Sequence, residues 1–151
     1  MTTTYAYAAR ASAVTEDAPP RAVPARWAPG LHALLRIGAG LLFMEHGLQK
    51  LFGLLGGMGP SGGSVPLFSL MGLAGVLECC GGLLLVLGLF TRPVALVLLL
   101  EMLYAFLTVH LPKGGAPIQN GGEFALLYGL IFAFLAGNGA GPASLDSRRG
   151  G

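Results

Sequence analysis

The sequence predicts an all-α integral membrane protein, an antiparallel bundle of four transmembrane helices with its N and C termini in the cytoplasm. Of its 151 residues, 54% are hydrophobic and only 11% are charged. A water-soluble chain of this length needs a more polar surface, because its interior is too small to hide so many apolar side chains. In addition, the apolar residues gather in four long segments that Gly-, Pro- and Ser-rich stretches separate.

The chain divides into an arm, a membrane domain and a tail. Residues 1–29 are polar and contain four prolines, so we expect a flexible cytoplasmic arm. Residues 30–140 form the membrane domain, and residues 141–151 form a C-terminal tail. The four helices of the membrane domain are expected at about 31–53, 67–90, 93–111 and 121–138.

The connections between the apolar segments predict how the helices run. The first segment is long enough, at ~1.5 Å per residue, to cross a hydrocarbon core of about 30 Å. The second and third segments are joined only by Thr91–Arg92–Pro93, so they must be antiparallel neighbours, and Pro93 is tolerated in a first helical turn. The last two segments are short, which leaves a soluble bundle as the competing interpretation. However, residues 83–90 and 94–100 lack the charged stripe that such helices show.

The distribution of positive charge predicts the orientation. Four crossings put both tails and the Thr91–Arg92–Pro93 turn on one side of the membrane. The arginines of that side are Arg10, Arg21, Arg26, Arg92, Arg148 and Arg149. Only Lys50 and Lys113 lie on the loop side, so the tails are expected in the cytoplasm. The net charge of +2 comes without a dense Lys/Arg run, so no nucleic-acid partner is expected.

Ionisable residues near the outer ends of the helices predict a polar site. The main candidates for binding a cofactor there are His46, Lys50, His110 and Glu123. The antiparallel order brings them together beneath the two outer loops, and His46 and Lys50 lie one helical turn apart. Histidine titrates near neutral pH, and Glu45 or Glu123 would orient its ring. The secondary candidates are Glu45, Glu78, Glu101 and Asn120.

Each of these candidates also has a structural interpretation. Asn120-Gly121-Gly122-Glu123 has the spacing of a capping box, in which Asn120 caps the helix and Glu123 occupies its third position. Lys50 at a membrane edge would extend to water. His46 and His110 would be interface histidines, and haem ligation by this pair is the least favoured alternative.

Two carboxylates are expected deeper in the membrane. Inserting a charged side chain within a membrane span costs roughly 2.5 to 3.5 kcal/mol on insertion scales. Each such residue must therefore be paired, be neutral or serve a function. Glu78 and Glu101 would pair with Arg36, become protonated, or face one another and share a proton. Glycines at three- and four-residue steps around Glu78 would let a neighbouring backbone approach it. No metal site is predicted, and the adjacent Cys79 and Cys80 are expected to be packing residues.

Several motifs together resemble the DoxX family of bacterial membrane proteins. They are residues 46–53 (HGLQKLFG), Glu78 followed by Gly81-Gly82, residues 88–92 (GLFTR) and residues 120–128 (NGGEFALLY). The resemblance covers roughly residues 31–146. It implies a four-helix protein of the bacterial inner membrane. The family is named after a subunit associated with quinone-linked thiosulfate oxidation. Other members look like membrane partners of thiol and oxidative-stress enzymes, and the family offers no agreed catalytic residue.

The expected function is a membrane subunit of a quinone-linked redox or oxidative-stress system. A quinone is the cofactor that this hypothesis implies, and the expected partners are the lipid bilayer and a redox or thiol enzyme. Two alternatives stay open. One is a non-catalytic anchor or assembly partner, in which polar residues only hold the helices together, and the other is a small-solute or proton pathway through Glu78 and Glu101. The sequence also leaves a homo-oligomer open.

Overall fold

The computed structural model describes residues 24–149. Within this range the regular structure is helical, as predicted, apart from an isolated bridge between Met58 and Gly63. Most of the expected N-terminal arm, residues 1–23, lies outside the described residues. The first helical turn, η1 (Ala25–Trp27), precedes the expected end of the arm, and Pro29 is accommodated at the start of the next helix, where no amide partner is lost.

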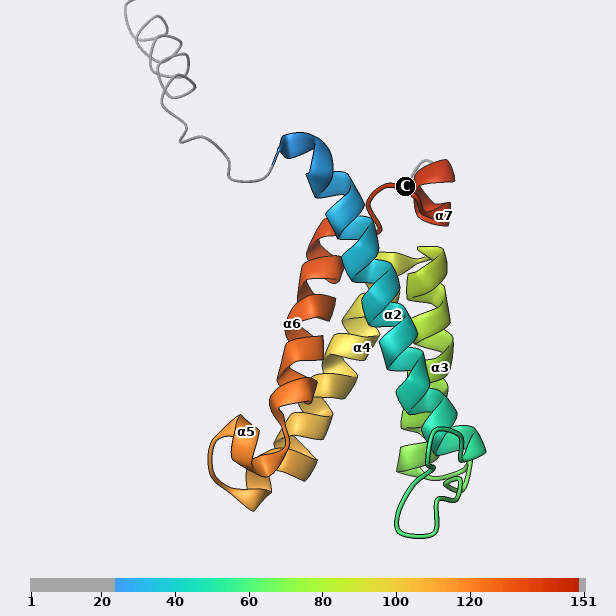
Figure 1. Cartoon of the computed structure of the whole chain (residues 1–151), viewed down its shortest axis with the longest axis vertical. Helices are drawn as coiled ribbons and strands as arrows, with labels where there is room; N and C mark the ends of the chain where they lie inside the picture. Colours follow the sequence, from blue (N-terminus) through green and yellow to red (C-terminus); the bar gives the residue numbers. More distant parts are fainter. Residues whose placement is uncertain (1–23, 150–151) are drawn as a thin grey trace, which may run out of the picture.

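Four long helices dominate the structure (Figure 1). They are α2 (Ala28–Phe52), α3 (Leu70–Leu87), α4 (Thr91–Ala105) and α6 (Glu123–Asn138). The helix α4 continues through a π-helical turn, η2 (Phe106–His110), and a 3-10 turn, η3 (Leu111–Lys113). Two short helices, α5 (Pro117–Asn120) and α7 (Leu145–Arg148), lie at opposite ends of the molecule (Figure 1).

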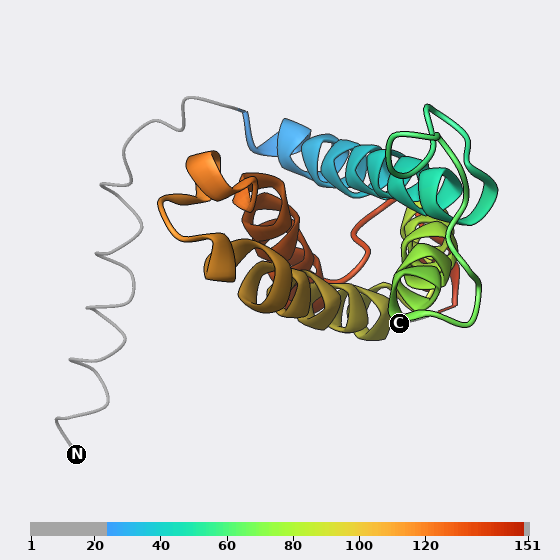
Figure 2. The ribbon, with the colours of Figure 1, turned by 90° about the horizontal axis from the view of Figure 1, so that it is seen from below.

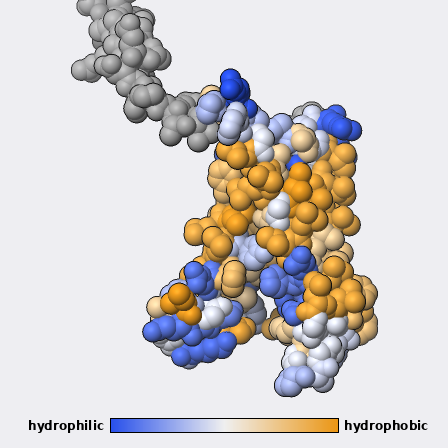
Figure 3. Space-filling model, in the orientation of Figure 1, coloured by the Kyte–Doolittle hydropathy of each residue, from blue (hydrophilic) through white to orange (hydrophobic). Residues whose placement is uncertain are grey.

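In the described part of the chain, three helical segments are long and apolar enough to cross a membrane: Ala25–Phe52, Leu70–Leu87 and Thr91–Lys113. The helix α6 is apolar but has only 16 residues, so the crossing of all four helices stays a prediction. Large apolar side chains along these helices are exposed, and Figure 3 shows them as a broad hydrophobic band. Such a band requires an apolar solvent, which a bilayer provides.

The long helices are arranged as two pairs. The helix α2 packs along α3, and α4 packs along α6. The pairs meet where α3 turns into α4 and separate toward the end that carries α5 (Figures 1 and 2). A cluster that includes Phe43, Leu85, Leu98 and Phe132 fills the region where all four helices meet. The opposite half is therefore less closely packed, and Lys50, Glu78, Glu101 and His110 lie there.

Glycines allow the close contact of α2 with α3. A Cβ atom at Gly47 would lie 2.7 Å from the carbonyl oxygen of Gly75, and one at Gly82 would lie 2.6 Å from that of Gly40. Neither distance is available to a real side chain, so glycine is required for the two backbones to touch. The predicted close approach of a neighbouring backbone beside Glu78 is confirmed, and it brings the end of α2 within reach of that carboxylate.

Arg36 connects three parts of the chain at the other end of the molecule. Its side chain is fully buried, and its guanidinium donates hydrogen bonds of 2.8 Å to the carbonyl oxygens of Leu85, near the end of α3, and of Ala143, in the tail. The last carbonyls of a helix have no partner within it, so they are available to this cation. The expectation that Arg36 pairs with Glu78 or Glu101 is therefore wrong.

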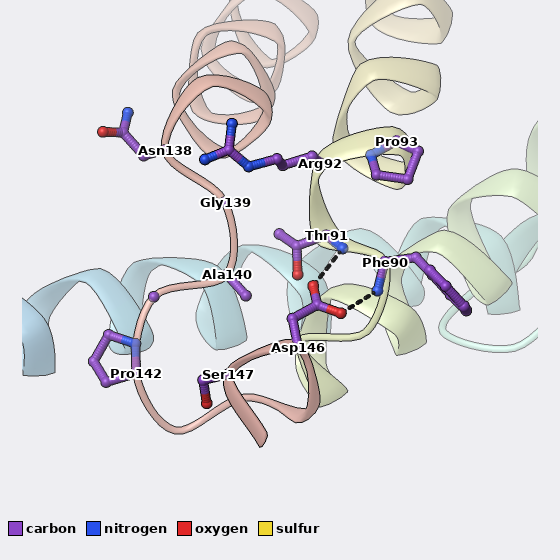
Figure 4. Close-up of a pocket in the computed structure, with 11 residues that line it drawn as sticks. Phe90, Thr91, Arg92, Pro93, Asn138, Gly139, Ala140, Pro142, Asp146 and Ser147 are labelled. Carbon is purple, nitrogen blue, oxygen red and sulfur yellow. Dashed lines mark hydrogen bonds between the residues drawn. The ribbon is translucent and has the colours of Figure 1, made fainter. Parts of the chain in front are cut away.

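The tail closes the turn between α3 and α4 (Figure 4). The two carboxylate oxygens of Asp146 accept hydrogen bonds from the backbone N–H groups of Phe90, at 2.8 Å, and Thr91, at 2.9 Å. Thr91 is the first residue of α4, and Phe90, which precedes it, has a left-handed backbone with φ of 51°. An aspartate from another part of the chain thus takes the capping role that the local sequence does not fill.

Asp146 makes a testable contribution to stability. Burial opposes its ionisation, but the amides of Thr91 and Phe90 outweigh that effect and hold the pKa of Asp146 below its ordinary value. A lowered folded-state pKa gives stability above the unfolded value of about 3.9, which is lost as the pH falls through the folded value. We expect Asp146→Asn to remove this dependence, so that the difference in unfolding temperature between the wild type and Asp146→Asn, measured in detergent, shrinks as the pH falls below about 4. A constant difference from pH 7 to pH 3 would contradict this role.

Candidate functional site

A cavity of about 510 Å³ lies between α3 and α4 in the half of the molecule where the helix pairs separate. Most of its lining is apolar and comes from α3 and α4, with Leu77, Val97 and Leu100 as examples. The ionisable side chains that line it are Lys50, Glu78, Glu101, Tyr104 and His110. An apolar cavity with a few convergent polar groups is the usual form of a small-molecule site.

Lys50 and Glu78 form an ion pair at the wall of this cavity. Lys50 lies in the last turn of α2, and Glu78 lies in the middle of α3, on the face that the glycines bring against α2. Both side chains are largely buried, with exposed fractions of 13% and 4%. Lys50 therefore turns inward to a carboxylate instead of extending to water, and the expectation of a purely interfacial lysine is wrong.

Buried carboxylate oxygens without a partner distinguish this site. Both side-chain oxygens of Glu101 and the Oε2 atom of Glu78 are buried and make no hydrogen bond with any described residue. Lining the same cavity, the two carboxylates leave three acceptor atoms unsatisfied. Unpaired buried polar groups are uncommon and cost about 1–3 kcal/mol each, so three together indicate a site that something else completes.

His110 is positioned by an unusual helical turn and by the loop that follows. It ends the π-helical turn η2, a type of turn that often occurs at functional sites. Its Nδ1 atom lies 3.1 Å from the carbonyl oxygen of Asn120. Because a carbonyl only accepts, Nδ1 must carry the proton, and in the neutral ring Nε2 is then an acceptor.

Asn120 has a different role from the predicted one. Its Oδ1 atom accepts a hydrogen bond of 2.9 Å from the backbone of Gly122, and its carbonyl oxygen orients His110. Glu123 is the first residue of α6 and not the third, so the expectation of a capping box is wrong. The glycines after Asn120 permit a tighter turn before the helix than the capping pattern assumes.

The other predicted residues lie outside the cavity. His46 is exposed on α2, one turn before Lys50, and its ring packs edge-on against Tyr128 of α6 with 6.0 Å between ring centroids. Glu45 and Glu123 are also exposed. In Figure 3, hydrophilic residues flank the notch between the separating helix pairs. The structure thus groups Lys50 and His110 with Glu78 and Glu101, and it places His46 and Glu123 apart from them.

A second cavity, also of about 510 Å³, lies beside the tail (Figure 4). It is lined by the turn before α4, the end of α6 and tail residues such as Asp146. The Asp146 carboxylate is already bonded to two amides, so it is not free for a ligand. We therefore place the candidate site between α3 and α4.

The chemistry available at the site is hydrogen bonding and proton transfer. Among residues 24–149, no group of three or more His, Cys, Asp or Glu side chains is close enough to hold a metal ion. Cys79 and Cys80 are free thiols, and neither lines the cavity. The groups that remain are a buried ion pair, a second buried carboxyl and a histidine with a defined tautomer.

Comparisons with known proteins identify one family and two related proteins. The sequence model of the DoxX family matches residues 31–111. A Haemophilus influenzae protein of uncharacterised function is 40% identical over 130 residues, which cover 82% of this chain and 93% of that protein. A Bacillus subtilis protein with the provisional name oxidoreductase CatD is 36% identical over 114 residues, which cover 75% of this chain and 82% of that protein. No solved structure matches the chain significantly.

Proposed function

Because the chain belongs to the DoxX family, we propose that it is the membrane subunit of a quinone-linked redox system and that the cavity between α3 and α4 binds the quinone ring. The observation that carries this proposal is the lining of the cavity, which combines apolar side chains with Lys50, Glu78 and Glu101 inside helices able to span a membrane. The name of the Bacillus subtilis relative also favours a redox role.

The position of the cavity suits a ligand that arrives through the bilayer. Several of its lining side chains, including Leu73, Val97 and Leu100, are exposed on the apolar surface of the helices. A quinone with a hydrocarbon tail dissolves in lipid and would reach the site from the side, between α3 and α4. Its tail would stay in lipid while its ring lies beside the buried carboxylates.

Reduction of a quinone to a quinol consumes two electrons and two protons, and oxidation of the quinol releases the same numbers. In our proposal the carboxyl groups of Glu101 and Glu78 exchange the protons, and Lys50 balances the charge of Glu78. The electrons pass to or from a redox centre of a partner subunit, in keeping with the thiol and oxidative-stress enzymes expected as partners. We further propose four antiparallel spans in a bacterial inner membrane, with both termini in the cytoplasm.

Quinone binding to the purified protein tests this function. In detergent or lipid nanodiscs, calorimetric titration with a short-tail benzoquinone is expected to show one saturable site. Glu101→Leu should weaken binding at least about tenfold, because it removes a buried polar partner of the ligand. Glu123→Gln is the matched control, since Glu123 is exposed and outside the cavity, and it should bind normally.

An anchor without a ligand gives a different result in the same experiment. If the polar residues only hold the helices together, neither the wild type nor Glu101→Leu binds quinone, and Lys50→Met, which breaks the pair with Glu78, lowers the unfolding temperature. Absence of binding by folded protein in every lipid and detergent tested would therefore remove the proposed function.

A further inference from the structure

We propose that the cavity between α3 and α4 prefers the reduced, hydroxyl-bearing form of its ligand, a quinol, over the corresponding quinone. This inference rests on the function proposed above and concerns which of the two redox forms the site recognises. It follows from the kinds of hydrogen-bonding groups on the side chains that line the cavity.

Carboxylate oxygens supply most of the free polar atoms. The side chain of Glu78 is only 4% exposed, and its Oε2 atom has no partner among the described residues although its other oxygen binds Lys50. Both oxygens of Glu101 are equally buried and unpartnered. A carboxyl group has two oxygens and at most one O–H group, so it offers more acceptor sites than donors, and Glu78 already has Lys50 as the donor of its ion pair.

The other polar side chains add little donor capacity. The Nδ1–H group of His110 is used by the carbonyl oxygen of Asn120, so the free nitrogen of the neutral ring is a further acceptor. Tyr104 can accept as well as donate. Lys50 is the cation of the lining, and it is already bonded to Glu78. Acceptors therefore outnumber free donors at this site.

A ligand completes such a site only if it brings its own donors. A quinone presents two carbonyl oxygens, which are acceptors and would leave the carboxylate oxygens unpaired. A quinol has the same ring and presents two O–H groups, which donate to Glu78 and Glu101. Sites built to bond a hydroxyl group strongly reject analogues that lack it, because their own buried groups are then left without partners.

A comparison of three probes under anaerobic conditions tests this preference. The purified full-length protein is titrated with a methyl-substituted para-benzoquinol, with the matching quinone and with the dimethyl ether of the quinol, which keeps the ring but has no donor. We expect the quinol to bind at least about tenfold more tightly than the quinone, and the ether to bind no better than the quinone.

Substitutions of Glu101 test whether its carboxylate is the source of the preference for the quinol. In Glu101→Gln the side-chain amide donates as well as accepts, so the advantage of the quinol should shrink several-fold and quinone binding should strengthen. Glu101→Asp retains the carboxylate and should retain the sign of the preference, and Glu123→Gln should match the wild type. The unfolding temperature of each variant, measured in the same buffer, shows that it is folded.

The outcomes separate the two proposals. Equal or tighter binding of the quinone by the wild-type protein overturns the quinol preference and leaves quinone-linked function standing. An undiminished preference in folded Glu101→Gln also overturns the inference, because the carboxylate would then not be its source. Binding of none of the three probes overturns the proposed function together with the inference.

Discussion

Gly47→Leu is expected to prevent α2 from packing on α3 and to lower the free energy of unfolding by at least about 3 kcal/mol. A Cβ atom at this position would lie 2.5 Å from the backbone nitrogen of Cys79 and 2.7 Å from the carbonyl oxygen of Gly75. These are backbone atoms of a helix interior, so they cannot rotate away as a flexible side chain would. The helices must separate, and the contacts along their whole length weaken.

Thermal unfolding in detergent measures this effect, and Gly38→Leu provides its control. Gly38 is on the same helix, and a Cβ atom there would meet nothing within 4 Å. Leucine also has the higher helix propensity at both sites, so the control should be as stable as the wild type or more stable. Similar unfolding temperatures for the two variants would show that the close helix contact is not required.

Lys50→Met is expected to destabilise the protein by about 3–5 kcal/mol, because it leaves the carboxylate of Glu78 buried without its partner. Replacing both members of a buried pair with apolar residues is often neutral, so Lys50→Met combined with Glu78→Leu should recover most of that loss. The double variant would nevertheless lose the polar wall of the cavity. We therefore expect it to be a folded protein that no longer binds a quinone or a quinol.

Chemical or thermal unfolding of the single and double variants, beside ligand titration, separates stability from binding. Lys113→Met is the matched control, because Lys113 is exposed in η3 and its replacement should change stability by less than about 0.5 kcal/mol. A double variant that is no more stable than Lys50→Met would mean that the unpaired carboxylate of Glu78 does not destabilise the protein. Normal ligand binding by the double variant would show that the ligand does not bind beside Lys50 and Glu78.

The helices were predictable because lipid imposes one simple requirement on a spanning segment. A long apolar run must become a helix to satisfy its own backbone, and the positions of α2, α3, α4 and α6 follow the predicted ranges within a few residues, apart from the end of α4, where the π-helical turn η2 takes its place. The glycine contact was also visible in the sequence, since small residues recur at helical spacing around Glu78. What these features share is that each depends on residues close together in the chain.

The pairing of side chains was less predictable because it depends on how each helix is rotated about its axis. Lys50 was expected near the outer surface, and Glu78 was expected near the middle of the membrane. A long lysine side chain spans that difference in depth once the glycines bring the helices together. The carbonyl contacts of Arg36 could not be found from residue types, because backbone atoms carry no sequence signal.

The π-helical turn illustrates the same limit. Residues 106–110 are apolar or weakly polar and fit an ordinary α-helix equally well by pattern. The extra residue in the turn changes the direction in which His110 projects, so the side-chain grouping at the cavity differs from one drawn on an ideal helix. Asn120, predicted as a cap, instead fixes the histidine from the following loop.

Asp146 has a consequence for how the protein is made. It follows all of the long helices in the chain, so the ribosome synthesises α3 and α4 before it. Until Asp146 is made, the amides of Phe90 and Thr91 lack the carboxylate that they bind, and until Ala143 is made, Arg36 lacks one of its carbonyl partners. The hairpin of α3 and α4 is thus secured only late in biogenesis, and chains that stop before Asp146 should be exposed to membrane proteases during that interval.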